Sequence, residues 1–244
     1  MELVYFACIW MLASFVKSIS GMGSGMFAAP SMLLFMDIQL VVPVICTLSI
    51  LQSVGLAIQY RKEFHLNDIL FVLICAIPGI FMGTYALKVL SSHVLEIFMA
   101  LFLICYAIWS FMHTQRVKAR KNTVMAGACG FFSGFFGSTT AFAGPPLAIY
   151  VLYAGWKSEK VLGFLGCAFV LINAITCVSQ YFAGLYTKEI LGYLLVGVPA
   201  CGVGMCLATP FIKYISQNVF RKIILLLIGF AGLISLLRVI SHYF

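Results

Sequence analysis

The sequence predicts an all-α integral membrane protein made of two inverted-topology repeats, each a broken-helix hairpin followed by three transmembrane helices. The chain is 63% hydrophobic and only 9% charged, with a mean hydropathy of +1.10, so it lacks the polar surface that a water-soluble protein needs. Its long apolar runs do not alternate polar and apolar residues, so helices rather than strands must span the bilayer. The third observation is an internal repeat.

This repeat holds without a gap from about residue 16 to about residue 83. Gln59 and Tyr60 recur as Gln180 and Tyr181, a shift of 180 − 59 = 121 residues. The same shift relates Gln52 to Asn173, Cys46 to Cys167, Gly23 to Gly144, Pro78 to Pro199 and Gly83 to Gly204. Duplication of an apolar unit is typical of membrane transporters. We therefore divide one membrane domain into a first repeat (1–112), a basic linker (113–122) and a second repeat (123–244).

Each repeat begins with an apolar stretch that is interrupted near its middle, at 3–36 and at 123–154. The first interruption extends from Lys17 to Gly25 and the second from Gly137 to Pro146. Glycine costs about 1 kcal/mol inside a helix and proline about 3 kcal/mol, so each stretch should form two short helices with an irregular link. We expect arms of about 12 to 17 residues, which is short for a crossing.

The remaining elements are uninterrupted apolar runs at 41–60, 69–90, 94–112, 160–182, 190–212 and 218–240. Each run is long enough to cross a hydrocarbon layer about 30 Å thick as a helix.

The distribution of Lys and Arg decides whether each broken stretch crosses once or returns, because cytoplasmic loops collect positive charge. Single crossings would divide the 15 basic residues eight against seven. Returning hairpins place eleven on one side and three on the other, with Lys17 left aside. The eleven are Arg61, Lys62, Arg116, Lys118, Arg120, Lys121, Lys157, Lys160, Lys213, Arg221 and Lys222, and the three are Lys88, Lys188 and Arg238. We therefore expect hairpins, a cytoplasmic linker 113–122 and both termini outside.

A broken helix inside a membrane leaves backbone N–H groups unpaired at the start of its second half, where the helix dipole favours negative charge. The two broken tips therefore predict a mid-membrane site for a small anion. The candidate residues are Ser20, Gly21, Gly23, Ser24 and Gly25 in the first tip, and Ser138, Thr139, Thr140, Gly144 and Pro145 in the second.

Three further side chains complete the predicted site. The 121-residue shift relates Lys17 to Ser138, at the start of the second tip. An unpaired cation inside the membrane is costly, so Lys17 should face a cavity with a negative partner. The alternative for Lys17 is that its side chain snorkels to the cytoplasmic interface. Gln52 and Asn173 are buried amides at equivalent points, and they either line the site or hydrogen-bond between helices.

The sequence supports no cofactor, metal or enzymatic site. The nine cysteines include no Cys-x-x-Cys pair, the four histidines form no cluster, and no nucleophile with a base appears in the apolar segments. The net charge of +8 is mostly an orientation signal, so nucleic acid is not an expected partner.

These features resemble the TauE/SafE family of membrane transport proteins, also called sulfite exporters. The first repeat carries Gly21-x-Gly23-x-Gly25 followed by Pro30, which is similar to that family's glycine motif. The second carries Gly134, Gly137 and Gly144-Pro145-Pro146, although Ser138, Ala141 and Ala143 replace further glycines. The resemblance covers nearly the whole chain and implies export of sulfur-containing anions such as sulfite or organosulfonates.

We therefore expect a multi-pass secondary transporter of the cell (inner) membrane, with alternating access to a site between the two tips. The alternatives are an anion channel with the same filter and, less favoured, a membrane-embedded enzyme. The expected partners are a small anionic substrate and membrane lipid. The sequence leaves the coupling ion, a proton or sodium, and a homodimer open.

Overall fold

The computed structural model describes residues 2–63, 66–112, 123–156, 158–208 and 210. Within these residues the regular structure is entirely α-helical, without a strand. The described helices are α1 (Glu2–Ser20), α2 (Ser24–Met32), α3 (Ile38–Gln59), α4 (Leu66–Val89), α5 (Ser92–Met112), α6 (Thr123–Thr140), α7 (Gly144–Ala154), α8 (Ser158–Phe182) and α9 (Lys188–Ala208).

Five of the described helices, α1, α3, α4, α8 and α9, are long and apolar enough to cross a membrane. The expected runs at 41–60, 69–90, 94–112, 160–182 and 190–212 coincide with α3, α4, α5, α8 and α9 to within a few residues. The all-helical, multi-pass architecture is thus confirmed. The expected linker 113–122 and the expected crossing 218–240 lie outside the described residues.

Both repeats begin with a helix that breaks and returns. The first break lies at Gly21 and Gly23, with φ of 77° and 103°, and the second at Ala141, with φ of 63°. The expected arm length of about 12 to 17 residues is wrong, because α1 and α6 have 19 and 18 residues whereas α2 and α7 have 9 and 11. Each first arm remains helical through its small polar residues and ends only where the backbone turns left-handed.

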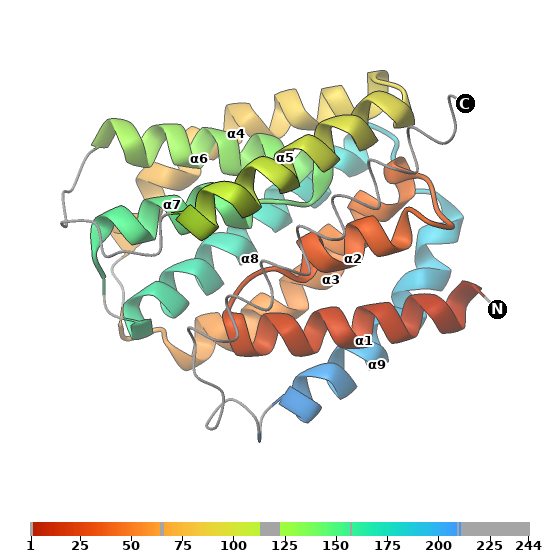
Figure 1. The fold of residues 1–244 in the computed structure, drawn as a ribbon, viewed down its shortest axis with the longest axis horizontal. Helices are drawn as coiled ribbons and strands as arrows, with labels where there is room; N and C mark the ends of the chain where they lie inside the picture. Colours follow the sequence, from red (N-terminus) through yellow and green to blue (C-terminus); the bar gives the residue numbers. More distant parts are fainter. Residues whose placement is uncertain (1, 64–65, 113–122, 157, 209, 211–244) are drawn as a thin grey trace.

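The directions of the helices follow from their contacts and can be followed in Figure 1, where α1 and α3 run from right to left while α2 returns. Thr47 contacts Cys177, whereas the backbone N of Ala57 lies 2.7 Å from the position of a Cβ on Gly166. Later positions in α3 therefore meet earlier positions in α8, so these two helices are antiparallel.

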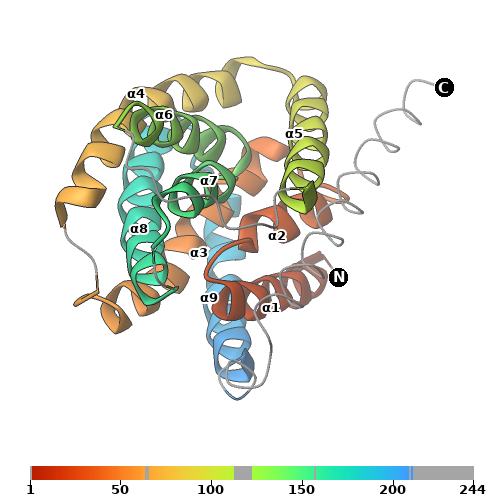
Figure 2. The ribbon, with the colours of Figure 1, turned by 60° about the vertical axis from the view of Figure 1, so that its left-hand side comes forward.

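Two other helix pairs are parallel. In the first pair, the rings of Phe6 of α1 and Tyr193 of α9 pack at a tilt of 58° with centroids 5.0 Å apart, and Met11 of α1 packs against Gly204 further along α9. In the second, α4 and α6 approach along a series of small residues in the same order, with Val72 at Gly130 and Ala76 at Gly134. Figure 2 shows both pairs side by side.

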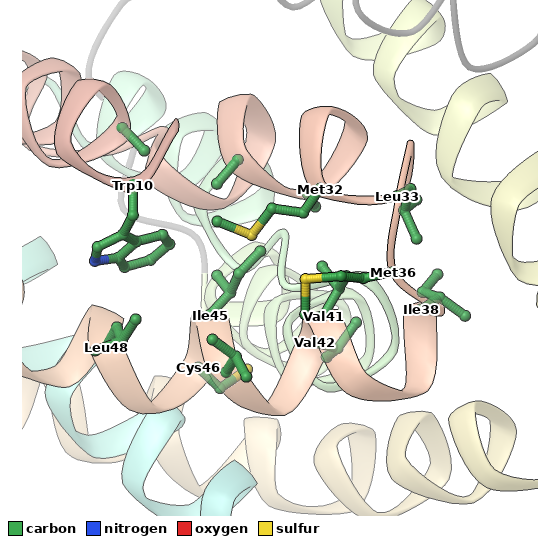
Figure 3. Close-up of a cluster of buried hydrophobic side chains, with 14 of the residues drawn as sticks. Trp10, Met32, Leu33, Met36, Ile38, Val41, Val42, Ile45, Cys46 and Leu48 are labelled. Atoms are coloured by element: carbon green, nitrogen blue, oxygen red, sulfur yellow. The ribbon is translucent and has the colours of Figure 1, made fainter. Parts of the chain in front are cut away.

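The buried apolar residues form two clusters that divide the helices into two bundles. The first bundle contains α1, α2, α3, α5 and α9, and the second contains α4, α6, α7 and α8, although Leu87 near the end of α4 packs in the first core. Each bundle thus combines a hairpin and its following helix from one repeat with the fourth helix of the other repeat, and the first bundle also contains α5. Figure 3 shows part of the first core, in which Met32 and Met36 point toward Val41 and Ile45 of α3.

The starts of α4 and α8 lie at the same end of the molecule. Lys160 Nζ of α8 is 2.7 Å from Asp68 Oδ2 of α4, and it also lies 4.3 Å from the centroid of the Trp156 ring. Because these helices begin together, the described residues that precede them, 60–63 and 155–156, belong to the same end of the bundle.

Candidate anion-binding site

A small pocket lies where the first and second bundles meet, and it brings both broken tips together. Its volume is about 30 Å³, room for about two water molecules. The lining residues are Lys17, Gly23, Ser24, Gly25, Met26, Ser49, Ala141, Phe142, Ala143, Gly144, Phe169 and Asn173. The first six belong to the first bundle and the others to the hairpin and third helix of the second repeat.

The starts of both second-half helices face this pocket. Gly23 occupies the N-cap position of α2 and Ala143 that of α7, and neither helix receives a side-chain cap. The first N–H groups of a helix have no partner within that helix, so the start of α2 offers donors from Ser24 onward. The start of α7 offers fewer donors, because Pro145 and Pro146 carry no N–H.

The two tips touch through their backbones. Gly25 packs so closely against the carbonyl oxygen of Ala141 that any Cβ at position 25 would overlap with it. Glycine is therefore required here by close approach rather than by its dihedral angle.

Lys17 is the only basic residue among the described residues that line the pocket, and it is 4% exposed. Its Nζ donates to Ser49 O at 3.1 Å and to Ser53 Oγ at 2.8 Å, and it lies 5.4 Å from the centroid of the Phe169 ring. It reaches across to α3 instead of snorkelling to an interface. Among the described residues Lys17 has no ion-pair partner.

No carboxylate lies near the pocket. All seven acidic residues of the chain are described, and each lies in a loop or within the first two turns of a helix. They are Glu2, Asp37, Glu63, Asp68, Glu96, Glu159 and Glu189. Among the described residues, the pocket therefore combines the amino group of Lys17 and two helix N-termini with no carboxylate.

The sequence-predicted residues separate into two groups in the structure. Those that line the pocket are Lys17, Gly23, Ser24, Gly25, Gly144 and Asn173. Those that do not are Gly21, Gln52, Ser138, Thr139, Thr140 and Pro145, and the side chain of Ser20 lies outside the described part.

The hydroxyl groups of the second tip are occupied within their own helix. Ser138 Oγ donates to Gly134 O at 2.8 Å, Thr139 Oγ1 to Phe135 O at 2.6 Å, and Thr140 Oγ1 to Phe136 O at 2.9 Å. Such back-bonding is common for Ser and Thr within helices, and it directs these hydroxyls away from the pocket.

The predicted amides also differ in position. Gln52 Nε2 donates to Ser14 Oγ at 2.6 Å and thereby connects α3 to α1 beside the pocket. Asn173 lines the pocket, with its Nδ2 donating to Phe169 O at 2.8 Å.

Sequence reasoning missed Ser49, Met26, Phe169 and the segment 141–143. Helical spacing could have found two of these residues, since Ser49 lies three positions before Gln52 and Phe169 four before Asn173. Nothing in the sequence marks Ala141, because its role depends on backbone contact. No group of three or more His, Cys, Asp or Glu residues in the described part could hold a metal ion.

The family model of the sulfite exporter TauE/SafE matches residues 6–234, nearly the whole chain. No curated protein and no solved structure shows significant similarity to this chain. The resemblance seen in the glycine motifs is therefore confirmed, and the chain belongs to the sulfite exporter TauE/SafE family of membrane transporters.

Proposed function

We propose that this member of the TauE/SafE family is a secondary transporter that exports a small sulfur-containing anion, such as sulfite or an organosulfonate. The observation that carries the proposal is the pocket between the tips, where Lys17 and the uncapped starts of α2 and α7 meet and no carboxylate is present. Such a site attracts an anion and repels a cation.

The anion would be held mainly by the first tip. The backbone N–H groups at the start of α2, the hydroxyl of Ser24 and the ammonium of Lys17 supply donors, and Asn173 faces them from α8. Hydrogen bonds to a charged oxygen are about twice as strong as neutral ones, which favours an oxyanion with several oxygens. Because the pocket is small, the tips must separate slightly when the anion enters.

Alternating access would arise from movement of one bundle against the other. The 121-residue shift relates α1 to α6 and α4 to α9, so the contact of α1 with α9 is equivalent to the contact of α6 with α4. The equivalent helices α3 and α8 run antiparallel beside the pocket. This pattern supports an inverted repeat with its two-fold axis in the membrane plane, an arrangement in which rocking exposes a fixed site to either side.

For orientation we propose a cytoplasmic linker and outward-facing termini. The contact between Asp68 and Lys160 supports this topology, because it brings the loops that carry Arg61 and Lys62 to the same end as Lys160. Cysteines introduced at positions 116 and 157 should then react with impermeant reagents from the same face. Labelling from opposite faces would contradict returning hairpins.

The test of function is thermal stabilisation of the purified protein by sulfite, sulfate, thiosulfate, sulfoacetate, taurine and carboxylate analogues. A ligand at 100 times its dissociation constant stabilises a protein by about 2.7 kcal/mol. We therefore expect sulfur oxyanions to raise the melting temperature selectively. Lys17→Met should fold but lose this shift. Lys88→Met removes an exposed lysine from α4 and should retain it.

Two outcomes would contradict the proposal. If no anion raises the melting temperature, the proposed site is excluded. If sulfur oxyanions raise the melting temperature of Lys17→Met as much as that of the wild type, Lys17 is not part of the site. Flux in vesicles separates transporter from channel, because a transporter saturates with substrate while a channel follows voltage with weak saturation.

A further inference from the structure

We propose that Lys17 carries one proton together with each anion, as a neutral amine in the empty site and as an ammonium when the anion is bound. This inference rests on the proposed function and deepens it by naming the coupling ion and its carrier.

The hydrogen bonds of Lys17 match a neutral amine. An ammonium group has three N–H donors, whereas a neutral amine has two donors and a lone pair. Lys17 Nζ has two oxygen acceptors among the described residues, Ser49 O and Ser53 Oγ. Ser53 Oγ itself donates to Ser49 O at 2.7 Å, which leaves its lone pairs available to the amine. No further acceptor for the third donor of an ammonium lies among the described residues, and an anion in the pocket would supply one.

Among the described residues, the groups around Lys17 supply no permanent counter-charge. On α3 and α9, the titratable groups that interact with it electrostatically are the thiols of Cys46 and Cys201. The start of α2 contributes the neutral Ser24, and α8 contributes the neutral Phe169 and Asn173. The Phe169 ring attracts a cation weakly compared with an ion pair. A buried ammonium with no counter-ion is strongly disfavoured, so the anion is the missing partner.

The coupled step is balanced in atoms and charge. The amine of Lys17, one proton from the aqueous side that the site faces, and one anion combine to give the ammonium–anion pair. On release to the other side, the anion and the proton leave together, and the amine returns neutral. The expected ratio is one proton per anion, because the equivalent position in the second tip is Ser138, whose hydroxyl bonds its own helix.

The proton taken up on binding can be measured directly. We would titrate the purified protein at about pH 9 with sulfate, thiosulfate and sulfoacetate, whose acid groups stay ionised there, by calorimetry in buffers of different ionisation enthalpy. The wild type should take up close to one proton per anion, and its dissociation constant should rise about tenfold per pH unit in the alkaline range.

Two variants test whether Lys17 is the residue that takes up the proton. In Lys17→Arg the guanidinium is always protonated, so anion binding should persist without proton uptake and with little pH dependence. Lys88→Arg makes the same change at an exposed site and should behave like the wild type.

Each outcome decides between the two proposals. Binding to the wild type without proton uptake overturns the coupling but leaves the anion site intact. Proton uptake that persists in Lys17→Arg also overturns it, by placing the proton elsewhere. If Lys17→Arg fails to bind, the wild-type measurement decides alone. Failure of the wild type to bind any probe overturns the proposed function itself.

Discussion

Lys17 and Ser138 occupy equivalent positions in the two repeats, but their side chains point in different directions. Lys17 reaches across to Ser49 and Ser53 of α3, whereas Ser138 Oγ bonds back to Gly134 O. The second tip also has fewer backbone donors, because two prolines follow Gly144. The duplicated unit has therefore become chemically unequal, and the first tip is the expected anchor of a bound anion.

Ala141 provides a prediction about stored backbone strain. It is the only non-glycine residue with positive φ in the described part of the chain, and an alanine in this conformation costs about 1 kcal/mol. Ala141→Gly should therefore raise the melting temperature in detergent by roughly 2 to 4 °C. Ala143→Gly is the matched control, because Ala143 has φ of −67° and gains nothing from glycine. Equal effects of the two substitutions would show that Ala141 is not strained.

The helix contact between α4 and α6 depends on an absence of side chains. Gly79 and Gly83 of α4, and Gly130 and Gly134 of α6, each lie against backbone of the facing helix. Small residues four positions apart let helices approach closely inside membranes, where van der Waals packing is a main source of association. Gly204, the equivalent of Gly83, makes the same kind of approach to Met11 of α1. The close contact is thus a property of the repeated unit.

A pair of glycine substitutions tests this contact. A Cβ on Gly134 would overlap with Ala76 O and lie 3.0 Å from its carbonyl carbon, so Gly134→Ala should destabilise the protein by about 1 to 3 kcal/mol. Gly202 in α9 has no atom within 4 Å of the position that a Cβ would take, so Gly202→Ala should be neutral or slightly stabilising. Thermal unfolding in detergent gives both values. A Gly134→Ala protein as stable as Gly202→Ala would contradict the close packing of α4 and α6.

The sequence predicted the elements better than the site. Apolar runs and glycine-rich breaks are local features, so the five described helices expected from apolar runs, α3, α4, α5, α8 and α9, and the two breaks lie within a few residues of their expected positions. The arm lengths depended on which residue turns left-handed, and Ala141 gives no sign of this in the sequence. The pocket lining depended on side-chain direction, and the hydroxyls of Ser138, Thr139 and Thr140 bond within α6.

In the whole molecule, the fourth helix of each repeat belongs to the bundle of the other repeat. α4 packs on α6 and α8, while α9 packs on α1 and α3. The connections between α3 and α4 and between α8 and α9 therefore cross from one bundle to the other. The candidate anion site lies between the bundles, next to the antiparallel contact of α3 and α8. Any relative motion of the two bundles must then alter the contact between α3 and α8.

Locking α3 to α8 should therefore stop transport without unfolding the protein. Thr47 Oγ1 lies 3.6 Å from Cys177 Sγ, so Thr47→Cys places a second sulfur within reach of the native thiol. Oxidation of this variant should abolish sulfoacetate efflux from vesicles, and reduction should restore it; sulfite is unsuitable because it cleaves disulfides. Thr47→Ser and the double variant Thr47→Cys/Cys177→Ala cannot form the bond and should remain active after oxidation. Full efflux through the cross-linked protein would mean that the bundles do not move apart along α3 and α8, and access to the pocket would then have to come from the tips alone.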